Sequence, residues 1–164
     1  IDETAQMALR LDAAIAEVPL PNGQRSDVFA RAERAAWEET GEAYRPDLLA
    51  DVPLIPAHTA LLTTTVYHGS NPPGIVDIAP SESPRPAGWT AALVIVDGLI
   101  AQAVDDGICQ RFSHVPGMPE LLLRAVSYRR HINDLHSASR SNTRSHIERV
   151  EQHLVSRASA ILER

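Results

Sequence analysis

The longest apolar run of the chain, residues 89–109 (WTAALVIVDGLIAQAVDDGIC), most restricts how this sequence can fold. Residues 91–96 are uncharged and mostly large, so protein has to cover both faces of this segment. Asp97 follows directly. Because an ionised carboxylate is costly to bury alone, Asp97 needs a hydrogen bond, a cation, a metal ion or a shifted pKa. The run predicts a buried central helix over about residues 87–110, with Gly98 allowing another group to approach it closely.

Composition favours one helical domain over residues 1–164. The chain is 44% hydrophobic but only 4% aromatic, so its core has to be built mainly from Ala, Leu, Ile and Val, which suits close-packed helices. Asp97, Asp105 and Asp106 interrupt the best candidate for a membrane span, so we expect no membrane partner. Cys109 is the single cysteine, and the first residues lack the pattern of a secretory signal. Both features favour a cytoplasmic location.

Apolar residues at helical spacing predict four further segments. A first helix over residues 2–18 would bury Met7, Leu11, Ala14, Ile15 and Val18 and leave Asp12 and Glu17 outside. Ser26 or Asp27 would cap a second helix that buries Phe29, Ala32, Ala36, Trp37 and Tyr44. A helix over residues 119–136 would leave Arg124, Arg129 and Arg130 largely outside an apolar stripe formed by Leu121 or Leu122, Ala125, Tyr128, Ile132 and Leu135. A last helix would start at a capping box of Ser145 and Glu148 and bury Ile147, Val150, Leu154, Ala158 and Ile161.

Residues 45–88 form an irregular insertion, because eight of the twelve prolines lie there. Residues 57–68 suit either a short helix or a strand, and we favour the helix because no convincing partner strand is visible. Residues 69–86 are predicted to form a long surface loop, either a lid, a partner-binding arm or a poorly ordered segment. The fold class is therefore an all-α bundle of five to six helices with a long Pro-rich loop.

Charge is divided unevenly along the chain. All fifteen basic residues are Arg, and nine of them lie in residues 111–164 together with only five of the 21 acidic residues. We expect this basic tail to pair with the acidic part of the same chain or of a second copy; the alternative is a phosphate-bearing ligand. A net charge of −6 argues against a nucleic-acid partner.

Acidic side chains on two predicted helices are the main candidates for chemistry. Glu38, Glu39 and Glu42 lie on the second helix and Asp97 on the central one. If these helices pack side by side, the carboxylates could converge on Mg²⁺, which prefers hard oxygen ligands. Bound Mg²⁺ would hold the phosphates of a nucleotide and activate water. The three Glu residues also suit a solvated helix face.

The sequence Glu38-Glu39-x-x-Glu42 resembles the first metal motif of MazG-like all-α nucleoside triphosphate pyrophosphohydrolases. The Pro-x-Pro-x-Gly sequence at residues 84–88, followed by an apolar helix, is similar to the region that carries their second motif, Glu-x-x-Asp. Here Val94 stands where that motif has its Glu, and Asp97 matches its Asp. The resemblance implies a metal-dependent oligomeric hydrolase or a degenerate relative, with Arg129 and Asn133 as phosphate-binding residues.

Histidine and cysteine offer weaker candidates. The pairs His131/His136 and His146/His153 lack the i, i+4 spacing that places two metal ligands on one helix face. Cys109 follows an apolar helix end, which favours a buried thiol over a reactive one.

Three functions follow from these patterns. We favour a helical protein without catalysis or cofactor that works through oligomerisation, most simply as a homo-oligomer, or through partner binding. Its seam of residues 147–161 would be buried against another chain. In that case an Arg, from among Arg124, Arg129 and Arg130, should cap Asp97. The alternative is the Mg²⁺-dependent hydrolase, in which Asp97 should face Glu38 and Glu42 across a cleft. A third is a helical pocket for a small ligand, with apolar walls and residues 69–86 as its lid.

Overall fold

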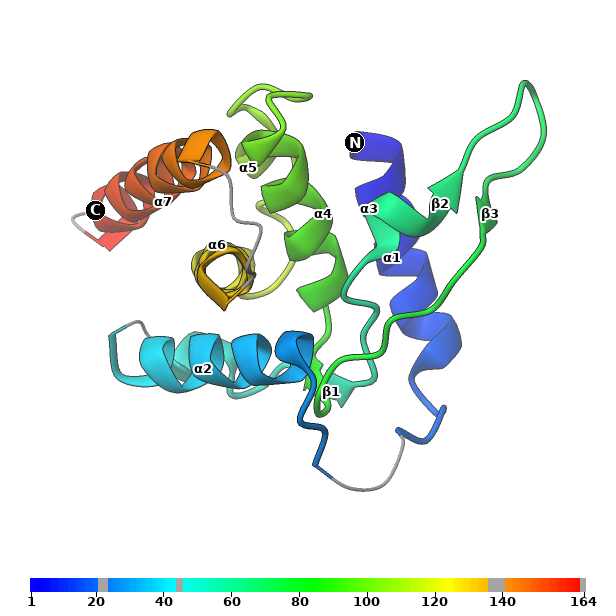
Figure 1. The fold of residues 1–164 in the computed structure, drawn as a ribbon, viewed down its shortest axis with the longest axis horizontal. Coiled ribbons are helices and arrows are strands. Elements are labelled where there is room, and N and C mark those ends of the chain that lie inside the picture. Colours follow the sequence, from blue (N-terminus) through cyan, green and yellow to red (C-terminus); the bar gives the residue numbers. More distant parts are fainter. Residues whose placement is uncertain (21–23, 44–45, 136–140, 163–164) are drawn as a thin grey trace.

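The computed structural model describes residues 1–20, 24–43, 46–135 and 141–162, and these are mostly helical (Figure 1). The elements in chain order are α1 (Asp2–Ile15), α2 (Val28–Ala43), the 3-10 helix η1 (Pro46–Leu49), β1 (Leu54–Ile55), α3 (Leu61–Thr64), β2 (Thr65–Val66), β3 (Gly74–Ile75), β4 (Arg85–Pro86), α4 (Trp89–Ile100), α5 (Ile108–Arg111), α6 (Met118–Leu135) and α7 (Ser141–Leu162).

Helix α6 lies at the centre of the helical packing. Helices α2, α4 and α7 pack against it, and α1 covers another side of α4 (Figure 1). Every residue from Trp89 to Val96 is buried, as the apolar run predicts. Trp89 is fully buried between Trp37 of α2 and Tyr128 of α6, with ring centroids 5.1 and 6.3 Å away. This first turn of α4 therefore joins three helices.

The start of α2 agrees with the prediction from the sequence, and the buried face of α1 agrees with it only in part. Asp27 caps α2, because its Oδ1 accepts the N–H groups of Phe29 and Ala30. The stripe predicted for the first helix is right only in part: Met7 and Leu11 pack against the core, but α1 also buries Thr4, Ala5, Ala8 and Asp12, and Val18 is half exposed. Small residues on α1 let it lie close to α4, and the larger ones remain at the edge of that contact.

The central helix is shorter than predicted, because α4 ends at Ile100. Gln102 adopts a left-handed conformation (φ 56°), and two backbone bonds close the end, from Ala103 N–H to the Gly98 carbonyl and from Gln102 N–H to the Leu99 carbonyl. This Schellman arrangement usually has Gly at the left-handed position. Because Gln102 stands there, the sequence did not predict that the helix ends at this point. Gly98 does permit a close approach, since a Cβ there would meet Ile1 Cγ2 at 2.7 Å.

The Pro-rich region is more ordered than the predicted loop. Residues 57–68 divide into the single turn of α3 and the strand β2, which pairs antiparallel with β3. The hydroxyls of Thr64 and Thr65 bond the carbonyls of Ala60 and Leu61. Strand β4 pairs with β1, and a bridge joins His58 to Pro80. The partner strand β3 was not predicted, because it is only two residues long.

Several other expectations are wrong in detail. Arg124 is buried rather than outside the stripe of α6, because Glu120 one turn earlier binds its guanidinium at 3.1 Å. Helix α7 begins at Ser141, so Ser145 lies within it and cannot be its cap. Phe29, Leu135 and Ile161 are about half exposed. Tyr44 lies outside the described residues.

Across the described part of the chain, no helix combines the length and the apolar character needed to cross a membrane.

Candidate functional site

Asp97, the acid within the apolar run, is paired with Arg129 of α6. The Nε and Nη2 atoms of Arg129 donate to the two carboxylate oxygens at 2.6 and 2.7 Å. Nη2 also donates to the Thr59 carbonyl, at 2.9 Å. Burial works against the charge of Arg129, but the Asp97 carboxylate outweighs it and raises the pKa of Arg129. The bidentate pair meets the requirement that the sequence placed on Asp97.

Glu39 belongs to a second group of polar contacts, between α2 and α6. Its carboxylate accepts bonds from Ser127 at 2.9 Å, from Arg130 at 2.7 Å and from His131, whose Nε2 lies 2.7 Å away. Burial opposes ionisation, but the bonds from His131, Arg130 and Ser127 outweigh it and lower the pKa of Glu39 to about 2. Glu39 is therefore an ionised carboxylate held by α6.

The other residues of the predicted metal site are not brought together with Asp97. Glu38 is exposed on α2, and Asn133 is partly buried near the end of α6. Glu42 lies in the last turn of α2, but its side chain is outside the described residues. Helices α2 and α4 each pack on α6, and within the described ranges no three His, Cys, Asp or Glu side chains form a group that could hold a metal ion.

The basic C-terminal part pairs with the acidic N-terminal part inside this chain. Besides the Asp97 and Glu39 contacts, Arg111 donates from Nε to Asp2 at 2.6 Å. Arg149 donates to the Leu99 carbonyl. The opposite charges of the N-terminal and C-terminal parts therefore pair within one chain.

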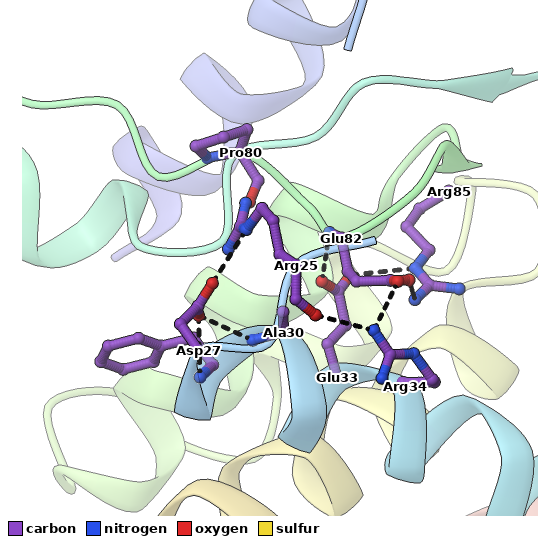
Figure 2. Close-up of polar contacts among 9 residues, drawn as sticks. Arg25, Asp27, Ala30, Glu33, Arg34, Pro80, Glu82 and Arg85 are labelled. Carbon is purple, nitrogen blue, oxygen red and sulfur yellow. Dashed lines mark hydrogen bonds and ion pairs between the residues drawn. The ribbon is translucent and has the colours of Figure 1, made fainter. Parts of the chain in front are cut away.

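Glu33 is a buried acid that the sequence patterns did not single out. Its side chain is 2% exposed and accepts bonds from Arg85 Nε at 2.9 Å, from Trp89 Nε1 at 3.2 Å and from the Glu82 N–H at 2.7 Å. Figure 2 shows how this acid and Arg34, which binds Glu82, fasten residues 80–86 to α2. Because α2 also carries exposed acidic residues, the local sequence did not predict that Glu33 is buried.

Asp12 is a second buried acid outside the predicted stripe. Only 6% of the residue is exposed, and its Oδ2 accepts the Gly88 N–H at 2.8 Å. Burial raises the pKa of Asp12 to about 6, although the bond from Gly88 acts in the opposite direction. Its Oδ1 is buried and has no hydrogen-bond partner among the described residues. Asp12 also lines a cavity of about 490 Å³.

The described surface also carries an apolar arm. Residues 65–76, which we call the ribbon, contain β2 and β3 and project from the helices beyond α3 (Figure 1). Val66, Tyr67, Ile75 and Val76 on the ribbon are between 38% and 70% exposed, and Ile78 just after it is 72% exposed. At its base lies an apolar groove of about 350 Å³, lined by residues that include Leu11, Ile15, Val18, Ile75, Ile78 and Pro80.

Comparison of the chain with protein-family models, with curated proteins and with solved structures finds no match in any of the three.

Proposed function

We propose that this protein, a helical bundle with an apolar arm, acts by associating with a second copy of itself rather than by catalysis. The observation that carries the proposal is the exposed ribbon and the apolar groove beside it. Contiguous exposed apolar side chains of this kind are typical of interaction sites. The seam expected to mediate association, Ile147, Val150 and Leu154, is buried within this chain, where α7 packs against α6 and α4.

The charge of the ribbon favours a second copy as the partner. Residues 65–76 contain no Asp, Glu or Arg, although 22% of the chain is charged. In a two-fold symmetric contact the same patch faces itself, so a charge near the axis would meet a like charge. Natural proteins usually protect an exposed strand edge with charged residues, and residues 65–76 have none, although the exposed Asp77 follows them directly.

The patch carries both an exposed apolar side chain and an apolar groove. Val76 is 70% exposed and stands next to the groove formed by Val18, Ile75 and Ile78. In a symmetric dimer Val76 of each copy would fill the groove of the other. Each apolar side chain removed from water contributes about 1.5–3 kcal/mol.

Two contacts hold the ribbon in place for such binding. The hydroxyls of Tyr67 and Thr4 share a hydrogen bond of 2.6 Å, which ties the ribbon to α1. At the base, His58 is 2% exposed, and its Nδ1 accepts the Ala60 N–H at 3.2 Å. Its Nε2 therefore carries the proton and donates to the Asp77 carbonyl at 2.9 Å. A fixed arm loses less conformational entropy on binding.

We expect Val76→Asp to convert a dimer into a monomer, because it places a charge where the two copies would meet. Sedimentation equilibrium over a range of concentrations gives the mass of each variant. The control is Val155→Asp, which adds the same charge at an exposed position of α7. Wild type and Val155→Asp should both be dimeric. A wild-type protein that stays monomeric at every concentration contradicts the proposal, and loss of the dimer in Val155→Asp alone would assign the contact to α7.

The buried His58 predicts a specific pH dependence of stability. Burial lowers the pKa of His58, while the Asp77 carbonyl raises it to a smaller extent. The unfolded chain therefore binds this proton more readily than the native one. The contribution of His58 to stability is present above about pH 6.5, the ordinary value, and is lost as the pH falls through the folded-state pKa.

The measurement compares urea unfolding of wild type and His58→Gln across this range. The Gln variant should lose less stability on acidification, because it has no imidazole to protonate. Comparing the two proteins cancels the titration of Asp12, which acts in the opposite direction. Equal pH slopes for the two proteins would show that His58 does not titrate in this way.

A further inference from the structure

The cavity beside Asp12 has the construction of a small-molecule site. It lies between α1, residues 51–55, residues 87–88 and residues 114–116, and its volume of about 490 Å³ falls in the range of ligand pockets. Most of its wall is aliphatic, with Leu9, Val52, Ile55 and Val115 among the lining residues. It shares no lining residue with the groove beside the ribbon.

The polar groups that line the cavity favour a positively charged ligand over a negatively charged one. Asp12 and Asp51 line it, no Arg is among the described lining residues, and His114 is the other titratable group. Asp51 and His114 are exposed, whereas Asp12 is more than nine-tenths buried. An anion would therefore meet acidic side chains without a compensating cation.

Asp12 supplies the specific contact. Its Oδ2 is occupied by the Gly88 N–H, and its Oδ1 has no hydrogen-bond partner in the described part of the chain. Buried polar atoms without a partner are rare in proteins and call for an explanation. A cationic N–H donor makes the strongest hydrogen bond with a carboxylate oxygen.

We propose that this cavity binds a small, largely apolar molecule bearing a protonated amine, with the amine paired with the Asp12 carboxylate and the apolar part against the aliphatic wall. The burial that raises the pKa of Asp12 to about 6 leaves the carboxylate mostly ionised at neutral pH, ready to accept a cation. The site does not depend on the association proposed above.

The test is an NMR titration of the full chain with three probes of similar shape: phenethylamine, neutral 2-phenylethanol and anionic phenylacetate. We expect the amide signals of Ala13, Val52 and Gly88 to shift with the amine. The amine should bind about tenfold or more tightly than the alcohol, as a hydrogen bond to a charged group implies, and phenylacetate should bind most weakly.

Variants separate recognition from folding. Asp12→Asn keeps an oxygen for the Gly88 N–H but removes the charge, so it should abolish the preference for the amine over the alcohol. Glu3→Gln removes one acid from the same helix outside the cavity and should leave all three affinities unchanged. Ala16→Phe adds a ring at an exposed lining position and should weaken binding of both amine and alcohol. An unchanged preference in Asp12→Asn, or no shift at the cavity amides with any probe, would overturn the proposal.

Discussion

Replacing Glu33 with Ala should lower the free energy of unfolding by about 3–5 kcal/mol, the range found when one partner of a buried ion pair is removed. The Arg85 guanidinium, whose side chain is 11% exposed, would lose its carboxylate. The Trp89 and Glu82 N–H groups would lose their acceptor at the same time. Because these three donors come from the start of α4 and from residues 80–86, the loss should loosen the joint between the Pro-rich region and α2.

Urea unfolding monitored by Trp fluorescence is the measurement, since Trp37 and Trp89 are close to the altered site. Glu38→Ala is the matched control, because it removes an exposed acid from the same helix and should change stability by less than about 0.5 kcal/mol. Glu33→Gln should lie between the two, since an amide oxygen can still accept one N–H but cannot balance the charge of Arg85. A loss below about 1 kcal/mol for Glu33→Ala would mean that water replaces the carboxylate.

The second large effect concerns Asp97 and Arg129. We expect Arg129→Met to cost about 2–3 kcal/mol, because it leaves a largely buried carboxylate without its cation, and Asp97→Asn to cost somewhat less. The double variant should cost less than the sum of the two, with a coupling energy of about 1.5–3 kcal/mol. Costs that simply add would show that the two side chains do not stabilise one another.

The same variants decide between an ion pair and a metal site. If Arg129 satisfies Asp97, millimolar Mg²⁺ should leave the unfolding midpoint of the wild type unchanged. A MazG-like hydrolase makes the opposite prediction, because a ligand at a hundredfold excess over its dissociation constant stabilises the folded state by about 2.7 kcal/mol. In that case the midpoint should rise with Mg²⁺ in the wild type and not in Asp97→Asn.

Local sequence patterns were sufficient to place the long helices approximately. The apolar run at residues 91–96 is buried as expected, and the cap of α2 is Asp27, one of the two residues that the sequence offered for it. Helical periodicity and capping depend on residues three or four apart, so one sequence carries the information. For the candidate site, the same reasoning required a partner for Asp97 and named Arg129 among three possible Arg residues.

Only the tertiary structure decided which polar residues are buried. Asp12, Glu33 and Arg124 each lie on a helix that also carries exposed polar residues, so the local sequence does not mark them as buried. Each is buried beside a hydrogen-bond partner: Gly88 for Asp12, Arg85 for Glu33 and Glu120, one turn away, for Arg124. Strands β2 and β3 are two residues long, too short for an alternating pattern, so their pairing follows from long-range contacts. The sequence by itself thus determined the main helices and the need to neutralise Asp97. The ribbon, the cavity beside Asp12 and the choice of Arg129 depend on contacts between residues far apart in the chain, which local periodicity does not encode.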